Sequence, residues 1–346
     1  LILRLVMTIR EIPLIINGEK VRSTTDTWLD VLNPATQEVV ARVPMATKAE
    51  IEAAVANAAE AFKTWSKVSL TNRMRIMLTF QQLVREHTQE LAELVTLEHG
   101  KTLPDAEGEV GRSLEAIENA CSVTRLQLGE MANNAATGVD TYTLNKPIGV
   151  GLGITAFNFP LMLPSFMFPP AIACGNTFIL KPSEQAPSST ILLVELALKA
   201  GIPAGVLNVV HGGPDVVNQL IEADAVKAVS FIGSTHVGTH VYNHATKHGK
   251  RAQSMMGAKN HMVIMPDANK DRAINDLLGS AFGAAGQRCM ANPVTILVGK
   301  TREWLPEIVE RAKLMKVGPG IQRDADLGPV VSPQAKARII SLLDSG

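Results

Sequence analysis

The sequence has few aromatic residues and no excess of charge of either sign. Its 346 residues carry 33 basic and 33 acidic side chains, so the formal net charge is zero, and only 4% of the residues are aromatic. The balanced charge gives no basic footprint for nucleic acid or an anionic membrane. The scarcity of aromatic side chains argues against stacking platforms for single strands. We therefore expect no nucleic acid and no membrane as partners.

Cysteine is also scarce. Cys121, Cys174 and Cys289 are the three cysteines, and they are far apart and lack Cys-x-x-Cys spacing. This pattern argues against a disulfide framework or a zinc knuckle and fits a reducing compartment. We expect a cytoplasmic location, or the mitochondrial matrix if the source is eukaryotic.

The first residues form a short apolar stretch that Arg4 interrupts and that lacks a clear small-residue cleavage site. It does not predict a secretory signal. Met7 is a candidate start, which would make residues 1–6 an extension, and a transit peptide remains an open alternative because Arg4 and Arg10 are present and no acid precedes Glu11.

A charge-free run extends from Lys146 to Lys181. It does not predict a membrane span, because Asn158 and several prolines, among them Pro160 and Pro164, interrupt it. The run favours a buried strand, turn, helix and strand, as in a parallel sheet covered on both faces.

Hydrophobic periodicity divides the chain into three regions. Residues 47–136 predict helices at 48–65, 71–99 and 103–131, and a short strand follows at 139–145. From residue 148 strands and helices alternate. The predicted strands are 149–156, 177–181, 207–211 and 228–232, and the predicted helices are 161–174, 188–200, 214–223 and 235–248. This alternation predicts an α/β fold with a doubly wound sheet, whose ligands bind beyond the carboxyl ends of the strands.

A second α/β region begins near residue 261. Its predicted strands are 262–265 and 295–298, and its predicted helices are 270–282, 304–314 and 332–343. We therefore expect three parts: a helical region with an arm strand at 1–146, a Rossmann-like core at 147–260 and a catalytic domain at 261–346.

Cys289 is the candidate nucleophile. Small residues and Gly286 precede it, so a substrate can approach the sulfur closely. The neighbouring Arg288 favours the thiolate, which is the reactive form. The alternative is an inert cysteine that acts as a small hydrophobic residue.

Two strand ends carry candidate cofactor residues. Lys181 and Glu184 follow a buried strand, where a cation and a carboxylate can bind the hydroxyls of a ribose, or form an ordinary surface ion pair. Gly233 and Ser234 precede a helix whose free N–H groups suit a pyrophosphate, although Ser234 can instead cap the helix. The usual Gly-x-Gly-x-x-Gly fingerprint is absent from this turn.

Asn158 stands in an apolar setting, where its amide needs a partner. Its NH2 could donate to a developing oxyanion, or the residue could serve only the turn before the helix. A separate pattern, histidines at 236, 240, 244 and 248, is spaced for one helix face. We predict no metal there, because no acidic residue or cysteine is nearby to complete a site, and interpret the stripe as a solvated face.

Together, several motifs resemble the aldehyde dehydrogenase superfamily. They are Phe-Asn-Phe-Pro at 157–160, Lys-Pro-Ser-Glu at 181–184, Phe-Ile-Gly-Ser-Thr at 231–235 and Gly-Gln-Arg-Cys at 286–289. Three further segments, 256–260, 265–269 and 281–290, resemble its CoA-acylating, methylmalonate-semialdehyde branch. The similarity extends from about Ile15 to the last residue.

The resemblance implies a role for each site residue. Cys289 is implied as the nucleophile, and Asn158 with the backbone N–H of Cys289 as the oxyanion hole. Arg112 and Arg288 match arginines that hold a substrate carboxylate, for which a planar guanidinium is suited. The positions implied to bind NAD are Thr155, Phe157, Lys181, Glu184, Gln185, Gly233, Ser234 and Met256.

The implied reaction is NAD-dependent oxidation of methylmalonate or malonate semialdehyde, with loss of CO2 and transfer of the acyl group to CoA. Met255 stands where hydrolytic relatives have a glutamate base, and methionine cannot activate water. The alternatives are a hydrolytic aldehyde dehydrogenase that releases free acid, and an inactive NAD-binding fragment. The resemblance also implies family members that continue past Gly346 and assemble as homodimers or homotetramers, so we expect this chain to be a fragment or a truncated product.

Overall fold

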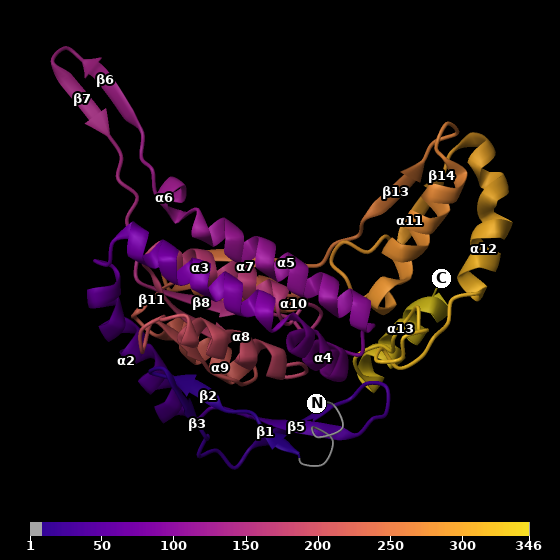
Figure 1. Ribbon diagram of the computed structural model, residues 1–346, viewed down its shortest axis with the longest axis horizontal. Coiled ribbons are helices and arrows are strands. Elements are labelled where there is room, and N and C mark those ends of the chain that lie inside the picture. The colour runs from indigo at the N-terminus through magenta and orange to yellow at the C-terminus, as the bar shows by residue number, and fades with distance from the viewer. Residues whose placement is uncertain (1–8, 346) are drawn as a thin grey trace.

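A seven-stranded sheet forms the centre of the computed structural model, which describes residues 9–345 (Figure 1). The strand order is β12-β11-β8-β9-β10-β2-β3, and the strands from β12 to β10 are mutually parallel. Their bounds are β12 Arg251–Met255, β11 Val226–Ile232, β8 Val150–Ile154, β9 Thr177–Lys181, β10 Leu207–Val209, β2 Leu14–Ile16 and β3 Glu19–Val21. The predicted doubly wound α/β fold is confirmed, whereas the start at Met7 and the extension over 1–6 lie outside the described residues.

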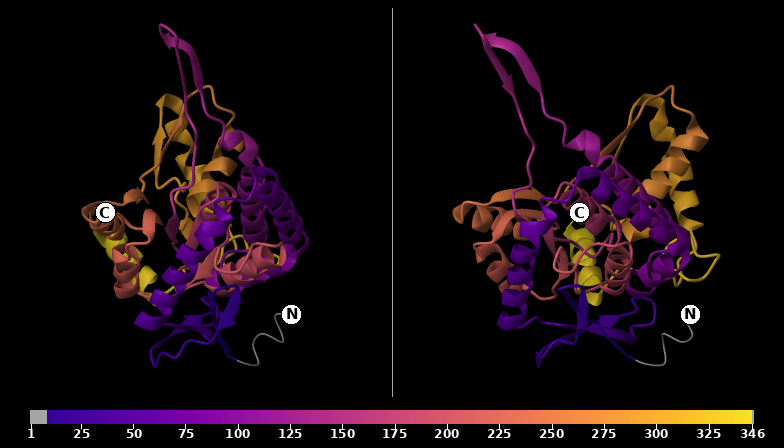
Figure 2. Two further views of the ribbon diagram at one scale, coloured as in Figure 1. Left: turned by 90° about the vertical axis from the view of Figure 1, so that its left-hand side faces the viewer. Right: turned by 60° about the vertical axis from the view of Figure 1, so that its left-hand side comes forward.

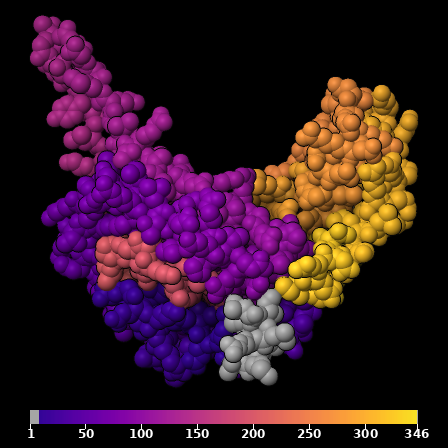
Figure 3. Space-filling view, viewed as in Figure 1, coloured from indigo at the N-terminus to yellow at the C-terminus, as the bar shows by residue number. Residues whose placement is uncertain are grey.

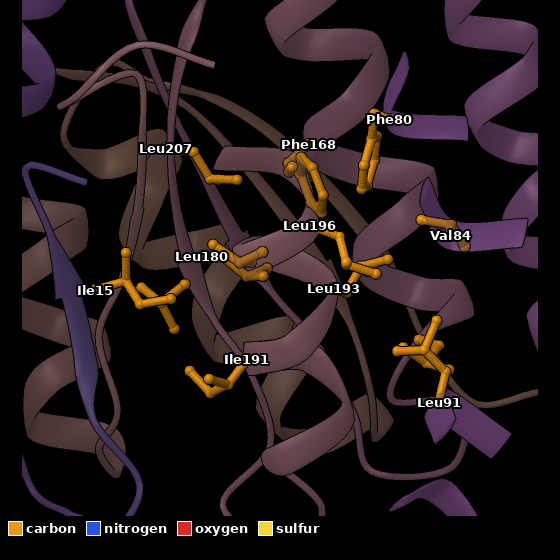
Figure 4. Close-up of a cluster of buried hydrophobic side chains, with 14 of the residues drawn as sticks. Ile15, Phe80, Val84, Leu91, Phe168, Leu180, Ile191, Leu193, Leu196 and Leu207 are labelled. Carbon is orange, nitrogen blue, oxygen red and sulfur yellow. The ribbon is translucent and has the colours of Figure 1, made fainter. Parts of the chain in front are cut away.

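Helices cover both faces of the sheet, because β9 alternates its side chains between two cores. Phe178 and Leu180 belong to one core, and Ile179 belongs to the other. The first core is formed with α3 Leu70–Glu86, α4 Thr88–His99, α5 Leu103–Cys121, α7 Met162–Ala173 and α8 Ser188–Lys199. The second core is formed with α2 Lys48–Trp65, α9 Pro214–Glu222 and α10 Thr235–Lys247. Figure 4 shows Leu180 beside Leu193 and Phe168 in the first core.

The strand registers bring the carboxyl ends of the parallel strands to one level. Ile154 at the end of β8 is paired with Lys181 of β9 on one side and with Phe231 of β11 on the other. On β11, Ile232 is paired with Met255 of β12. The residues that follow these strands therefore meet at one edge, as the sequence predicts.

Several predictions in the first 146 residues are wrong. The predicted helix at 71–99 is broken at His87 into α3 and α4. The predicted helix at 103–131 ends at Cys121, and the short α6, Val123–Leu126, follows it. Five strands precede α2 and were not predicted: β2 and β3 above, with β1 Arg10–Glu11, β4 Trp28–Leu32 and β5 Val39–Pro44.

Met131 begins a strand instead of ending a helix. β6 Met131–Ala136 and β7 Val139–Tyr142 form a two-stranded antiparallel hairpin whose residues are all exposed. The hairpin projects far from the body, opposite the C-terminal region (Figures 1 and 3). The predicted strand at 139–145 is thus confirmed over its first four residues.

The C-terminal region has its own small parallel sheet, whose two strands lie within one residue of the predicted ranges. β13 His261–Ile264 is paired with β14 Val294–Leu297, and helices α11 Lys270–Phe282 and α12 Leu305–Lys313 lie beside them (Figure 2). The last helix is α13 Pro333–Ser345, and two 3-10 segments, η1 Gly283–Gly286 and η2 Gly299–Trp304, join the elements. The domain boundaries at 146/147 and 260/261 stay predictions. Within residues 9–345, none of the helices has both the length and the apolar character needed to cross a bilayer.

Candidate active site

A cleft of about 370 Å³ lies between the carboxyl edge of the central sheet and the loop after α11. We call it the cysteine cleft. Its lining includes Phe157, Asn158, Gly233, Ser234, Met256, Arg288 and Cys289. The structure therefore brings together seven of the predicted site residues, which come from segments far apart in the sequence.

Backbone turns in η1 present Cys289 to this cleft. Ala284, Ala285 and Gly286 adopt left-handed conformations in succession, with φ of 51°, 55° and 72°. A non-glycine residue adopts the left-handed conformation at an energetic cost, and residues held in it are more common at functional sites than elsewhere. The Asn260 side chain then fixes the loop, because its Nδ2 donates to the carbonyl oxygens of Cys289 (2.8 Å) and Ala291 (2.9 Å).

Cys289 differs from the other two cysteines in exposure. Its side chain is exposed, whereas Cys121 and Cys174 are half-buried. Burial raises the pKa of the Cys121 thiol to about 11, and burial also raises the pKa of Cys174. Both are therefore poor nucleophiles at neutral pH.

A buried ion pair holds the segment that carries Asn158. Lys101 Nζ donates to Glu109 Oε2 and to the Asn158 carbonyl oxygen, both at 2.7 Å. The other oxygen of Glu109 accepts the backbone N–H of Leu161 at 2.8 Å. The side chains of Lys101 and Glu109 are only 1% and 0% exposed, so the pair tethers the turn between β8 and α7 from below.

Sequence reasoning missed this ion pair, although one signal was available. Glu109 stands on the stripe of α5 that also carries the buried Ala106, Val110 and Ser113. A carboxylate on a buried stripe needs a partner. Asn158 lines the cleft, and its Oδ1, an acceptor, is buried without a hydrogen bond to any described residue.

The two predicted carboxylate-binding arginines lie in different settings. Arg288 lines the cysteine cleft, and its Nη2 donates to Asp105 Oδ1 at 2.7 Å. Arg112 is not part of the cleft lining; its side chain is 58% exposed and pairs with Glu115 one turn away on α5 at 2.6 Å. Only Arg288 is thus brought next to Cys289, and a carboxylate bound there would share the guanidinium with Asp105.

A second cavity, about 260 Å³, lies next to the first. We call it the strand-end cavity. It contains Thr155, Lys181 and Glu184, and shares Ala156, Ile232, Gly233 and Ser234 with the cysteine cleft. An elongated ligand can therefore extend from Lys181 past Ser234 to Cys289. A larger cavity of about 500 Å³ lies between α7 and the sheet and contains none of the predicted site residues.

The polar groups of the strand-end cavity suit a sugar. Lys181 Nζ is hydrogen-bonded to the Glu184 carboxylate and donates to the Gly212 carbonyl oxygen at 3.2 Å. The Lys181 side chain is 7% exposed, so this is no ordinary surface ion pair. The hydroxyl of Thr155 is buried without a hydrogen bond to any described residue.

Ser234 caps α10, since its hydroxyl accepts the backbone N–H of Val237 at 3.4 Å. The helix N-terminus still opens into both cavities. Glycine suits position 233, because a Cβ there would lie 2.5 Å from the ring of Phe231. Gln185 is exposed and lines neither cavity, so its implied contact with NAD stays a prediction.

The position next to the cleft where hydrolytic relatives are expected to have glutamate is Met255, the last residue of β12. Its carbonyl oxygen accepts the N–H of Gly233 at 3.1 Å, which ties the strand end to the helix start. The thioether of the Met255 side chain has no titratable proton and cannot act as a general base.

One prediction about the histidine stripe is wrong. Glu222 of the neighbouring helix α9 lies beside His244, with Oε1 3.0 Å from Nε2. An acidic residue therefore does accompany the stripe. It escaped notice because it is 22 residues away in the sequence, on a different helix.

The model of the aldehyde dehydrogenase family matches residues 20–346. The chain belongs to the aldehyde dehydrogenase family. The family resemblance drawn from the motifs is thereby confirmed.

Relatives within the family agree on one branch. The chain is 51% identical to the rat mitochondrial methylmalonate-semialdehyde/malonate-semialdehyde dehydrogenase [acylating] over 335 residues, which cover 97% of this chain and 63% of that enzyme. An Arabidopsis thaliana enzyme, also named mitochondrial methylmalonate-semialdehyde dehydrogenase [acylating], is likewise 51% identical and is covered over 55% of its length. The chain thus spans less than two thirds of the length of these relatives.

Solved structures show the same fold. The methylmalonate-semialdehyde dehydrogenase of Oceanimonas doudoroffii superposes with a TM-score of 0.95 at 42% identity, over 97% of this chain and 69% of that one. An NAD+ complex of an aldehyde dehydrogenase from Bacillus cereus superposes with a TM-score of 0.93 at 28% identity, over 99% and 70%. The roles of individual site residues stay predictions.

Proposed function

We propose that this chain carries the nucleophile and the NAD site of a CoA-acylating dehydrogenase for methylmalonate and malonate semialdehydes. The observation that carries the proposal is that the two cavities lie side by side and share Ala156, Ile232, Gly233 and Ser234 in their linings. One ligand can therefore contact Lys181 and Glu184 at one end and the surroundings of Cys289 at the other.

The residues of the strand-end cavity fit NAD. Glu184 can accept from vicinal ribose hydroxyls that Lys181 also contacts, and the unpartnered Thr155 hydroxyl lies in the same cavity. The N–H groups at the start of α10 suit the pyrophosphate. When bound, NAD supplies the hydride acceptor for the oxidation.

The chain's own residues supply the covalent chemistry. The Cys289 thiolate adds to the aldehyde carbon, and the Asn158 amide and the Cys289 N–H donate to the resulting oxyanion. Hydride leaves the same carbon, and a thioester forms on Cys289. If the acyl group has a carboxylate β to this carbonyl, CO2 can leave because the thioester accepts the electron pair, and a proton then replaces it.

The acyl acceptor is the thiol of CoA. Its attack on the thioester forms propionyl-CoA or acetyl-CoA and frees Cys289. Met255 supports this choice, because a water molecule beside it would have no base to activate it. The word acylating in the names of the rat and Arabidopsis enzymes fits the same reaction.

We further propose that Arg288 selects substrates with a carboxylate, with Arg112 as its predicted partner. Arg288 already has a carboxylate at 2.7 Å, from Asp105. The remaining N–H groups of its guanidinium can bind a second one. Arg112 would have to leave Glu115 to take part.

The location and the assembly of the protein are also proposals. Three unpaired cysteines fit a reducing compartment, which would be the mitochondrial matrix in a eukaryote and the cytoplasm in a bacterium. Homodimers or homotetramers remain the expected assembly.

Product analysis tests the function. A protein of the relatives' length that contains this sequence is incubated with NAD and malonate semialdehyde, with and without CoA, and NADH, acetyl-CoA and free acid are quantified against a Cys289→Ser control. We expect acetyl-CoA in proportion to NADH, with CoA required for turnover and no product from the control. Free acid released at the same rate without CoA would show a hydrolytic enzyme instead.

A further inference from the structure

The last turn of α10, its C-cap residue His248 and the end of α9 place three metal-ligating side chains together. The potential ligand atoms of Glu222, His244 and His248 all lie within 4.8 Å of one another. Glu222 and His248 are exposed and His244 is partly exposed, so an ion can reach them from solvent. We infer that these three residues form a surface site for a divalent transition-metal ion, with Zn²⁺ as the ion that best suits the ligand set.

The spacing of the histidines favours chelation. Residues four apart on a helix lie on one face, one turn above the other. The rings of His244 and His248 are already 4.7 Å apart between centroids, at an angle of 64°. Two imidazoles and one carboxylate are a ligand set that zinc accepts, with water in the fourth position.

The hydrogen bonds prepare the ligand nitrogens. His248 Nδ1 lies 2.8 Å from the carbonyl oxygen of His244, which can only accept, so Nδ1 carries the proton. Nε2 of His248 then has its lone pair free for a metal, and the backbone bond orients the ring as in natural zinc sites. His244 Nε2 is 3.0 Å from Glu222 Oε1, close to the separation of two ligands on one tetrahedral zinc ion, roughly 3.3 Å from the usual bond lengths.

The simpler interpretation is an ion pair between His244 and Glu222. It accounts for those two residues and leaves His248 without a role. Lys250 follows His248 by two residues, and its ammonium is bound to the carbonyl oxygens of Ala223 and Val226.

The site is separate from the proposed chemistry. None of the three residues lines the cysteine cleft or the strand-end cavity. Ten residues of helix, about 15 Å, separate His244 from Ser234. A bound ion would join α9 to α10 and stabilise the folded chain, because the unfolded chain does not hold the ligands together.

Zinc titration tests the inference. The chain is stripped with a chelator and titrated with ZnCl2 by calorimetry, in a Cys289→Ser background so that the exposed thiol does not compete. We expect one ion per chain and a rise in the melting temperature with zinc. His244→Ala and His248→Ala should each weaken binding at least tenfold, and Glu222→Gln should weaken it less.

His236→Ala is the matched control, because His236 belongs to the same stripe but lies two turns from His244. It should bind zinc like the parent. Melting in chelator, measured for every variant, identifies any that fail to fold. Absence of zinc binding by the parent, or equal binding by the His244→Ala variant and the parent, would overturn the inference.

Discussion

Alkylation with limiting iodoacetamide should modify Cys289 far ahead of the other two cysteines. The thiolate is the reacting form, and at pH 8 a thiol with a pKa of about 11, as for Cys121, is only about one part in a thousand thiolate. An ordinary exposed thiol with a pKa near 8.5 is about one quarter thiolate. The thiolate fraction of an ordinary exposed thiol is therefore roughly 200 times that of Cys121.

Part of this advantage is offset, because a more basic thiolate is a better nucleophile. With a Brønsted coefficient near 0.45, the higher pKa of Cys121 makes its thiolate roughly tenfold more nucleophilic. Cys121 should therefore react about twentyfold more slowly than an ordinary thiol. Half-burial of Cys121 and Cys174 slows the reagent further.

The assay is peptide mass spectrometry over a time course, on the parent and on Cys289→Ser. The parent should label at Cys289 first, the variant should lose the fast phase, and NAD should change the Cys289 rate because that thiol lines a cavity that adjoins the strand-end cavity. Equal labelling of all three cysteines would refute the assignment.

Further predictions concern the supports of the site. Lys101→Met leaves the buried Glu109 carboxylate unpaired and should lower the free energy of unfolding, measured by urea denaturation, by about 3–5 kcal/mol. Adding Glu109→Gln should restore part of this loss. An unchanged urea midpoint for Lys101→Met would contradict the role of the ion pair in holding the turn. Arg288→Leu should raise the KM for malonate semialdehyde roughly ten- to hundredfold, because a charge-assisted hydrogen bond of about 1.5–3 kcal/mol is lost. Arg112→Leu should have a smaller effect, and neither variant should change the KM for propanal much. Equal losses for both aldehydes would indicate a folding defect. Burial lowers the pKa of His211 to about 3, so the unfolded chain takes up the proton first as pH falls below about 6.5. Stability should therefore fall by roughly 1.4 kcal/mol per pH unit from about pH 6.5 down to about pH 3. His211→Gln should flatten that slope, and a slope identical to the parent's would rule out this group as its source.

The sequence was sufficient for the parts of the fold that have a regular period. The charge-free run from Lys146 to Lys181 predicted a buried strand, turn, helix and strand, and β8, α7 and β9 lie there. Parallel strands bring their carboxyl ends together, so the sequence alone predicts that the residues after β8 and β11 lie at one edge of the sheet. Cys289 and Asn158 were expected at one site from the motifs, and both line the cysteine cleft.

The errors arose where a strand is defined by its pairing and not by a regular pattern in its own residues. Residues 131–136, Met-Ala-Asn-Asn-Ala-Ala, have no β-branched or aromatic pattern, and only their pairing with β7 makes them a strand. Two of the strands before α2 pair with distant strands: β1 with β5, and β2 with β10. Periodicity within a window carries no information about such long-range pairs.

Ionic contacts escaped for the same reason. Lys101 and the turn at Asn158 are 57 residues apart, and Arg288 and Asp105 are 183 apart. A charged side chain in a sequence is most often solvated, and only the fold reveals which ones are buried or paired. The arginine predicted to accompany Arg288, Arg112, is instead exposed beside Glu115.

The most direct test of the account traps the acyl group on the chain. The protein is mixed with NAD and malonate semialdehyde without CoA, quenched in acid, digested and analysed by mass spectrometry. The account predicts an acyl group on the Cys289 peptide in proportion to the NADH formed, and its transfer to give acetyl-CoA when CoA is added before the quench. Formation of NADH with Cys289 unmodified, or an acyl group that CoA cannot remove, would contradict it.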